Sequence, residues 1–234
     1  MIPYTRVADE YYDPIRHPTC ANFEELSKKF LEPVIRAMAG ETIRVLDVGA
    51  GRSLAAAVIA NFRSRLDHCV LLDISPAMLG HSSEWQKLGA TLVMPDARNT
   101  GLPSNSFQVL VSSLGDPYNN AQFWAEAHRL LCEGGTCLFT TPTPEWADWF
   151  RPAAERSEAQ FDLVNGQTIH VPSHVPSLER QVRMIQQAGF RISEIQSFFA
   201  SDVSGPLSAK LKPPGDGRAR IPILRGFKAT RLAE

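Results

Sequence analysis

Cysteine is scarce in this chain, and its cysteines fit neither a disulfide framework nor a Cys-x-x-Cys motif. The sequence has four cysteines in 234 residues, and none of them forms a Cys-x-x-Cys pair. A disulfide framework needs more cysteines at closer spacing, so we expect a reduced, cytoplasmic protein. We expect no metal site either. His170 and His174 are separated by Pro172, which prevents the helix that would place both rings on one face.

Long apolar runs and an excess of one charge are also missing. No stretch approaches the roughly 18 apolar residues of a membrane-spanning helix. The N-terminal residues lack the basic segment and apolar core of a secretory signal, so we expect neither a membrane span nor export. The net charge of −1 argues against a dedicated nucleic-acid binder, because lysine and arginine contacts to phosphate supply most of that affinity. With 44% hydrophobic and 21% charged residues, the composition is that of a globular protein with a sizeable core.

Between residues 42 and 141, short apolar runs rich in β-branched residues alternate with helical stretches. This alternation predicts an α/β fold, with a parallel sheet covered by helices on both faces. The predicted strands are Ile43–Val48, Cys69–Leu72, Thr91–Met94, Val109–Ser113 and Thr136–Thr140. The predicted helices are Ser53–Phe62, with Ser53 as its N-cap, Pro76–Leu88, and Ala121–Cys132, which should stop at Gly134–Gly135.

The flanking segments add a helical cover, a lid and further strands. A helix should begin near Asn22, with Pro33 kinking or splitting it, and another should follow the cap residue Ser177. Asn165–Gly166 between two β-prone runs predicts a hairpin. The last elements should be strands Arg191–Phe199 and Ile221–Thr230, joined by the loop Gly205–Gly217. We interpret residues 1–234 as one domain, with a cover over 1–40, a core over 41–141, a lid over 142–176 and the rest of the sheet over 177–234.

The most specific feature is the Gly49-Ala50-Gly51 turn after the first predicted strand. Glycines there allow a tight turn and let a ligand lie against the backbone. A dinucleotide fingerprint would need a third glycine where this chain has Leu54. A phosphate-binding P-loop is excluded because no Gly-Lys-Ser/Thr follows. The turn therefore indicates a nucleotide-like ligand without a pyrophosphate.

Three aspartates lie at or near the ends of successive strands. Asp47 precedes the first glycine, Asp73 ends the second strand and Asp96 ends the third. The carboxyl ends of parallel strands share one edge of a sheet, so these carboxylates should face one crevice. Three carboxylates suit a ligand that carries a ribose, an exocyclic amine and an α-ammonium group but no phosphate. S-adenosylmethionine has that set of groups.

With these motifs in this order, the chain resembles the class I S-adenosylmethionine-dependent methyltransferases, in the small-molecule branch called methyltransferase type 11 or ubiquinone-biosynthesis-like. The resemblance runs from about Tyr4 to Phe190. It rests on VLDVGAG at 45–51, LLDISPAML at 71–79, PDARNTGLP at 95–103, FQVLVSSLG at 107–115, EAHRLLCEGG at 126–135 and QQAGF at 186–190. It implies a Rossmann-like, doubly wound sheet of seven strands with an antiparallel last strand. It also implies S-adenosylmethionine as cofactor and S-adenosylhomocysteine as product.

The resemblance also implies which residues contact the cofactor, with Asp47 beside them at the glycine turn. Each part of the cofactor has its own set: Gly49 and Gly51 for the methionine portion, Asp73 for the ribose, Ile74 and Met78 for the adenine face, Asp96 and Ala97 for the adenine amine and ring edge, and Ser112 or Ser113 for the sulfonium. Position 53 holds serine where the family usually has glycine, and Gln108 stands where it often has aspartate.

Methyl transfer is an in-line displacement that depends mainly on alignment, so a catalytic side chain is optional. If the acceptor needs a base, we expect it among Tyr12, His17 and His170, which lie in the segments able to cover the methyl group. We expect a small-molecule acceptor methylated on oxygen or nitrogen, no membrane or nucleic-acid partner, and a monomer or homodimer. Three alternatives remain open: a methyltransferase acting on RNA or protein, a non-catalytic S-adenosylmethionine-binding module, and a dehydrogenase that would bind NAD.

Overall fold

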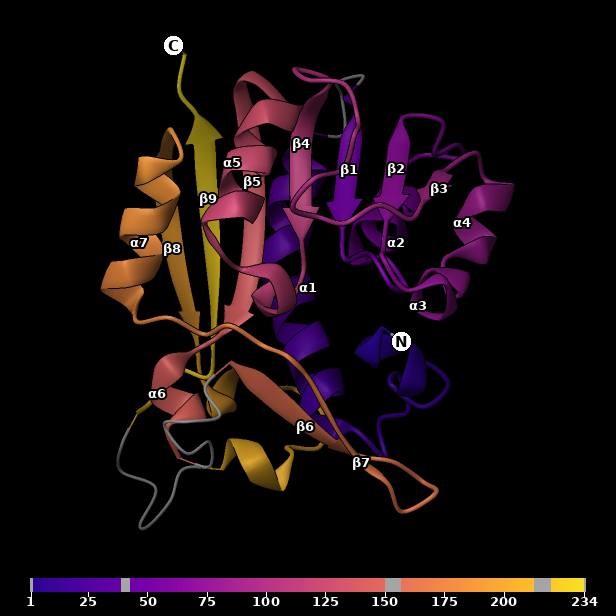
Figure 1. Cartoon of the computed structure of the whole chain (residues 1–234), viewed down its shortest axis with the longest axis vertical. Coiled ribbons are helices and arrows are strands. Elements are labelled where there is room, and N and C mark those ends of the chain that lie inside the picture. The colour runs from indigo at the N-terminus through magenta and orange to yellow at the C-terminus, as the bar shows by residue number, and fades with distance from the viewer. Residues whose placement is uncertain (1, 39–42, 150–156, 213–219, 234) are drawn as a thin grey trace.

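A seven-stranded sheet forms the centre of the molecule (Figure 1). The structure is a computed structural model that describes residues 2–38, 43–149, 157–212 and 220–233. The strand order is β3-β2-β1-β4-β5-β9-β8, with every pair parallel except those of β9, which runs antiparallel to β5 and β8. The strands are β1 Val45–Val48, β2 Cys69–Leu72, β3 Thr91–Val93, β4 Phe107–Ser112, β5 Leu131–Pro142, β8 Phe190–Phe198 and β9 Leu224–Arg231. The predicted doubly wound fold with an antiparallel last strand is confirmed.

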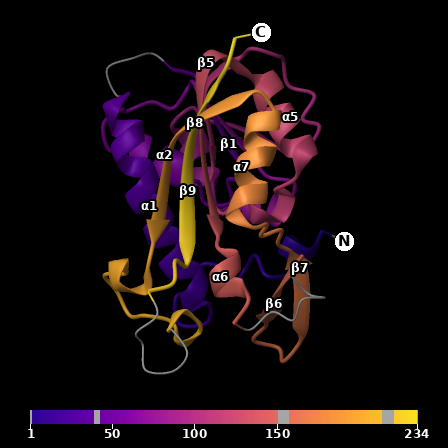
Figure 2. The same cartoon turned by 90° about the vertical axis from the view of Figure 1, so that its left-hand side faces the viewer.

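Helices cover both faces of the sheet (Figure 2). On one face lie α1 (Pro18–Ala37) and α2 (Leu54–Ala60), and on the other lie α5 (Ala121–Leu130) and α7 (Leu178–Gln187). All four residues of β1 are buried, as expected for a strand covered on both sides. Ser53 and Ser177 cap α2 and α7 through their side chains, as the sequence predicted.

The predicted helix 76–88 is wrong as a single element. The chain forms two short helices, α3 (Pro76–Gly80) and α4 (Ser83–Lys87). Between them the Ser82 hydroxyl, fully buried, donates to the carbonyl of Gly51 at 2.7 Å. A tertiary hydrogen bond to the glycine turn therefore ends the first helix, and local periodicity carries no sign of it.

Two other helix boundaries also differ from the prediction. The helix α5 ends at Leu130, and β5 begins at Leu131 and runs through the two glycines that were expected to stop the helix. The helix α1 begins at Pro18 and continues through Pro33, so neither the predicted start nor a split occurs. Instead of capping, the Asn22 side chain donates to the carbonyl of Pro206 and accepts from the amide of Ser208.

The N-terminal segment and a hairpin lie beyond the carboxyl ends of the parallel strands (Figure 1). The hairpin joins β6 (Glu158–Asp162) to β7 (Thr168–Pro172) through the predicted Asn-Gly turn. Its inner face packs on the N-terminal segment in an apolar cluster of Val7, Phe161, Leu163, Ile169 and Val171. The remaining elements are α6 Pro144–Ala147 and the 3-10 turns η1 Pro3–Arg6, η2 Asp116–Tyr118, η4 Ala200–Asp202 and η5 Ala209–Leu211. Residues 213–217 of the predicted loop lie outside the described residues.

Candidate functional site

The glycine turn after β1 is held in a conformation that other residues would strain. Gly49 and Gly51 have φ values of 67° and 47°. A Cβ atom on Gly49 would lie 2.3 Å from the Tyr118 hydroxyl, and one on Gly51 would lie 2.1 Å from the Tyr12 hydroxyl. Both the backbone conformation and the space therefore require glycine at these two positions.

Asp73 directly follows β2, and its side chain connects the glycine turn after β1 to this neighbouring strand. Its carboxylate accepts hydrogen bonds from the backbone amides of Gly51 at 3.1 Å and Ser75 at 2.9 Å. The side chain is only 8% exposed, and this burial raises the pKa of the carboxyl group, while the two amide bonds act in the opposite direction. Asp73 therefore presents a buried hydrogen-bond acceptor beside the turn.

Asp47 lies beneath the turn and supports it. The Ser53 hydroxyl donates to Asp47 at 2.7 Å and accepts from the amide of Ala56 at 3.0 Å. Burial raises the pKa of Asp47 to about 7, against the lowering effect of the Ser53 hydrogen bond. Asp47 does not line the cavity at the carboxyl ends of the strands. It would therefore affect a ligand there only indirectly, by supporting the glycine turn.

A cavity of about 330 Å³ opens at the carboxyl ends of β1, β2, β3 and β4. The cavity size falls within the range of small-molecule sites, and its place is the edge where open α/β sheets bind ligands. Seven of the predicted cofactor residues line it: Gly49, Asp73, Ile74, Met78, Asp96, Ala97 and Ser113. Gly49, Asp73 and Asp96 were predicted from the glycine turn and the strand ends, and the other four from the family resemblance.

Asp96 faces the same cavity with its charge already paired. Its carboxylate accepts from the Arg98 backbone amide and from the Arg98 guanidinium, at 2.8 and 2.9 Å to the same oxygen. The guanidinium holds the pKa of Asp96 below its ordinary value. An ionised carboxylate has about four acceptor positions, so Asp96 keeps the capacity to accept from a ligand amine.

Tyr118 is a cavity residue that the sequence interpretation did not assign. Its hydroxyl donates to the carbonyl of Val48 at 2.6 Å and lies 2.9 Å from the hydroxyl of Ser112. Since the single tyrosine proton is given to Val48, Ser112 is the donor in the second bond. Ser112 is thus buried behind Tyr118, whereas Ser113 lines the cavity.

A second cavity of about 410 Å³ adjoins the first. The two cavities share three lining residues, Tyr4, Tyr11 and Leu114. The second is enclosed by the N-terminal segment, the start of α1, α6, the β6 strand and the residues around η5. The molecule therefore offers two neighbouring cavities that share part of their lining.

The three predicted bases do not come together. His17 lines the second cavity, is 8% exposed and has an Nε2 atom without a hydrogen-bond partner among the described residues. Tyr12 lines neither cavity and accepts a hydrogen bond from the Arg52 amide at 2.8 Å. His170 lies 3.4 Å from Glu158 on the outer face of the hairpin and also lines neither cavity. A catalytic role for each stays a prediction.

Asp116 and His174 join the lining residues that sequence reasoning left unassigned. Asp116 lines the second cavity and His174 the first. The backbone joins them, because the His174 amide donates to the carbonyl of Asp116 at 2.7 Å. The sequence signal that could have indicated Asp116 is the Asp-Pro-Tyr run after β4, because it lies at the edge of the sheet where α/β folds bind ligands.

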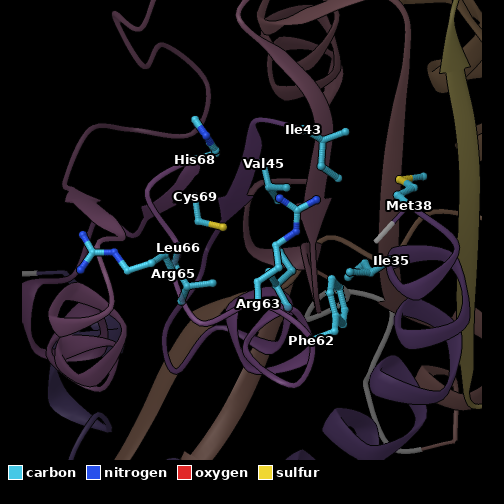
Figure 3. A pocket seen from close by; sticks show the side chains of 11 residues that line it. Ile35, Met38, Ile43, Val45, Phe62, Arg63, Arg65, Leu66, His68 and Cys69 are labelled. Atoms are coloured by element: carbon cyan, nitrogen blue, oxygen red, sulfur yellow. The ribbon is translucent and has the colours of Figure 1, made fainter. Parts of the chain in front are cut away.

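At the opposite end of the strands lies a much smaller space of about 20 Å³ (Figure 3). Its walls are mainly apolar, and Arg63, Arg65 and His68 lie at its edge. It has room for about one water molecule. The described residues contain no group of three metal-ligating side chains and no helix with the length and apolarity of a membrane span.

The first cavity fits S-adenosylmethionine by the chemistry of its walls. Asp73 and Asp96 supply acceptors for hydroxyl and amine donors, and the exposed face of Ile74 with Met78 supplies an apolar surface for a planar ring. The cofactor would bring an activated methyl group on a sulfonium. The chain itself supplies the glycine turn, the carboxylates and the lining shared with the second cavity.

Comparisons with known proteins bear on the fold and on its central part. Residues 46–139 match the family described as "Methyltransferase domain". No curated protein matches the chain in sequence. Among solved structures, the chain is similar to an S-adenosylmethionine-dependent methyltransferase from Mesorhizobium loti, with 19% identity, TM-score 0.59, and 85% of this chain and 96% of that one covered.

Two further structures share the fold. A SAM-dependent methyltransferase from Methanosarcina mazei has 17% identity and TM-score 0.62, with 86% of this chain and 98% of that chain covered. The PH0226 protein from Pyrococcus horikoshii has 13% identity and TM-score 0.67, with 99% of each chain covered. Residues 46–139 thus match a methyltransferase family model, and the solved structures show that the chain shares the fold of S-adenosylmethionine-dependent methyltransferases.

Proposed function

We propose that the protein transfers a methyl group from S-adenosylmethionine to a nitrogen or oxygen atom of a small-molecule acceptor that binds in the second cavity. The observation that carries the proposal is that the two cavities adjoin, since both are lined by Tyr4, Tyr11 and Leu114. Alignment of an acceptor with a methyl group at about 3–3.5 Å supplies much of the acceleration of such a reaction. Two adjoining cavities meet that need when one holds the cofactor and the other the acceptor.

In this proposal the first cavity binds the cofactor through the residues assigned by resemblance. Asp73 accepts from the ribose hydroxyls, and Ile74 with Met78 packs on the adenine. Asp96 with Ala97 contacts the adenine amine and ring edge. Gly49 allows the methionine portion to lie against the backbone, with Asp47 supporting the turn, and Ser113 lies near the sulfonium. Gly51 and Ser112 do not line the cavity and act through the turn and through Tyr118.

The second cavity has the character of a small-molecule site. Apolar and aromatic side chains form just over half of its lining, and polar or charged side chains form the rest. His17 is one of those polar groups; its Nε2 atom lies 3.7 Å from a carboxylate oxygen of Glu10 and makes no hydrogen bond with the described residues.

The proposal is tested by following the labelled methyl group. The protein is incubated with S-adenosylmethionine carrying a radioactive methyl group and with a cell extract separated into metabolites, protein and RNA. We expect the label to appear in the metabolite fraction, and the Asp73→Ala variant to give the background. Label in RNA or protein would favour a macromolecular acceptor, and no label in any fraction would favour a non-catalytic binding module. Either result contradicts the proposal.

A further inference from the structure

His17 lies where the N-terminal segment meets α1, on the wall of the second cavity. It directly precedes Pro18, the first residue of α1, and both residues line that cavity. The His17 side chain is only 8% exposed. Its ring packs edge-on against Phe161 of the hairpin, with the ring centroids 5.2 Å apart. The imidazole is therefore a buried polar group held between α1, the N-terminal segment and the hairpin.

The two ring nitrogens of His17 have different surroundings. Nε2 has almost no accessible surface and lies 3.7 Å from a carboxylate oxygen of Glu10, which is too far for a hydrogen bond. Glu10 is held in turn, because its carboxylate accepts from the Val164 amide at 3.2 Å. Nδ1 also makes no hydrogen bond with the described residues, but unlike Nε2 it is not fully buried. Glu10 therefore faces one nitrogen, and the other stays open to a ligand in the cavity.

The structural roles that a histidine could have at this position are not used. His17 is the N-cap residue of α1, yet its side chain makes no capping hydrogen bond. An apolar ring would pack on Phe161 equally well, without the cost of removing two polar nitrogens from water. A polar ring that is kept here without a hydrogen bond among the described residues points to a role in contact with a ligand.

The surroundings of His17 favour a neutral ring that can accept a proton. Burial is the largest influence and lowers the pKa of the imidazole, whereas the Glu10 carboxylate raises it. The charged groups that act on the ring are Glu10, Asp13 and Arg16 of the N-terminal segment, Asp162 of the hairpin and Lys210 of η5. The ring is therefore neutral near pH 7, and Glu10 lies where it stabilises the positive charge that a captured proton brings.

We propose that His17 is the general base of the methyl transfer and that the acceptor is a phenol or an enol, whose hydroxyl proton the imidazole takes. This inference rests on the function proposed above and names the base and the acceptor class of that site. A hydroxyl oxygen is a weak nucleophile until it loses its proton, so such an acceptor gains most from a positioned base. The aromatic rings of Tyr11 and Trp146, which also line the cavity, suit a flat acceptor.

The transfer can be written with its proton and electrons balanced. Neutral His17 carries its proton on Nε2, the tautomer that the neighbouring Glu10 carboxylate favours, so Nδ1 is free to accept the hydroxyl proton. The oxygen lone pair then forms the bond to the methyl carbon of S-adenosylmethionine as the carbon–sulfur bond breaks, and the electron pair of the broken bond stays on sulfur. A methyl ether and S-adenosylhomocysteine leave, and the imidazolium returns its proton to solvent.

The test uses 4-nitrophenol, whose anion is yellow and whose neutral form is nearly colourless. It is titrated into protein saturated with S-adenosylhomocysteine at a series of pH values, and the absorbance of the bound anion is followed. We expect the bound probe to ionise at a pH about one unit or more below that of the free probe, because its proton passes to His17 and the imidazolium then holds the anion. The readout is proton transfer within the complex, without methyl transfer.

Replacing the imidazole should reverse the sign of this effect. His17→Gln keeps a polar side chain that takes no proton, and burial then disfavours the anion, so the bound probe should ionise at a higher pH than the free probe. The probe 4-nitroanisole has the same body without the proton. It should bind the natural protein and His17→Gln within about twofold of each other, which shows that the cavity is intact.

Three further variants separate the base from its neighbours. Glu10→Gln keeps an oxygen that accepts from the Val164 amide but removes the charge, so the ionisation of the bound probe should move part of the way back toward that of the free probe. Lys210→Gln removes an exposed cation of the same cavity and should leave most of the effect in place. His170→Gln makes the histidine change on the outer face of the hairpin and should behave like the natural protein.

Several outcomes would overturn the inference. They are ionisation of the bound 4-nitrophenol at the same pH as the free probe or above it, an effect that persists in His17→Gln, loss of the effect in Lys210→Gln or His170→Gln equal to that in His17→Gln, or binding of neither probe. Binding of S-adenosylhomocysteine is measured first in the same samples. If it binds and 4-nitrophenol is not ionised, only the base and the acceptor class fail. If S-adenosylhomocysteine does not bind, the proposed function fails and this inference fails with it.

Discussion

Gly49 lines the first cavity and has no space for a side chain. It has a positive φ, and a Cβ there would lie 2.3 Å from the Tyr118 hydroxyl. In Gly49→Ala, that hydroxyl has to give up its hydrogen bond to Val48 and move. We expect the variant to bind S-adenosylhomocysteine at least about tenfold more weakly, because one hydrogen bond and the shape of the cavity wall change together. Calorimetric titration measures the loss.

Gly101 provides the matched control for backbone strain. Its φ of 65° is close to that of Gly49, yet nothing lies within 4 Å of a Cβ built on it. Gly101→Ala should lower the melting temperature slightly, since a non-glycine residue in this region costs about 1 kcal/mol, and should leave ligand affinity unchanged. Similar losses of affinity in both variants would show that strain, and not the contact with Tyr118, is the cause.

The candidate site residues differ in how far the sequence could predict their positions. Gly49 and Asp73 belong to a turn and a strand end, whose place follows from the order of the elements. The Asp-Pro-Tyr sequence after β4 could have placed Asp116 at the edge of the sheet, but its contact with the second cavity depends on segments that are distant in sequence. His170 could have been placed outside by alternation, because Ile169 and Val171 face the apolar cluster.

Among the elements, the hairpin and the N-terminal segment form one packed unit. Ile169 of β7 is 2% exposed and packs in the cluster that includes Val7 and Phe161. Truncation in Ile169→Ala should loosen both segments together, since large-to-small changes in such clusters cost about 2–5 kcal/mol. Hydrogen exchange should then increase in residues 4–12 and 158–172, and change little in β1 and β4.

Val164, at the tip of the hairpin, gives the control for that experiment. Its side chain is 64% exposed, so Val164→Ala should change stability by no more than about 0.5 kcal/mol. It should also leave hydrogen exchange unchanged. An increase in exchange confined to the hairpin in Ile169→Ala would contradict the coupling of the two segments.

The carboxylate of Glu126 ties α5 to the segment after β3 and makes stability depend on pH. It accepts from the amide and hydroxyl of Thr100, at 2.8 and 2.6 Å, and from Arg129. Hydrogen bonds from Arg129 lower the pKa of Glu126 to about 2. Because the folded-state pKa lies below the unfolded one, this contribution is full above the unfolded pKa and is lost as the pH falls toward about 2.

Replacing this carboxylate should therefore change how the stability of the protein depends on pH in the acidic range. Glu126→Gln should be less stable than the natural protein near neutral pH, and the difference in melting temperature should shrink as the pH falls from about 6 to about 3. Thermal unfolding followed by circular dichroism measures both. A difference that stays constant over this range would show that charge at Glu126 contributes nothing.

Element boundaries were predicted well where local signals decide them and poorly where tertiary contacts do. The N-caps Ser53 and Ser177 and the Asn-Gly turn are local, and the structure has all three. The break at Ser82 depends on the carbonyl of Gly51, which is distant in sequence. The early start of β5 depends on pairing between Phe107 and Leu131.

For the whole molecule, the alternation of strands and helices predicted the parallel core, and the family resemblance implied the antiparallel strand β9. The second cavity was beyond prediction, because it is lined by residues from five separate parts of the chain. Its walls exist only once the hairpin, α1 and η5 have been placed around the carboxyl ends of the strands. The sequence could thus predict residues that line the first cavity, but not the second cavity beside it.

The most direct measurement of the central claim is calorimetric titration of the protein with S-adenosylhomocysteine and, separately, with NAD. The account predicts that S-adenosylhomocysteine binds and NAD does not. In Asp73→Asn the affinity should fall about tenfold or more, as expected for lost hydrogen bonds to a charged group. Asp67→Asn, an exposed change near the other end of β2, should bind like the natural protein. Binding of NAD in place of S-adenosylhomocysteine, or equal affinity in the natural protein and Asp73→Asn, would contradict the account.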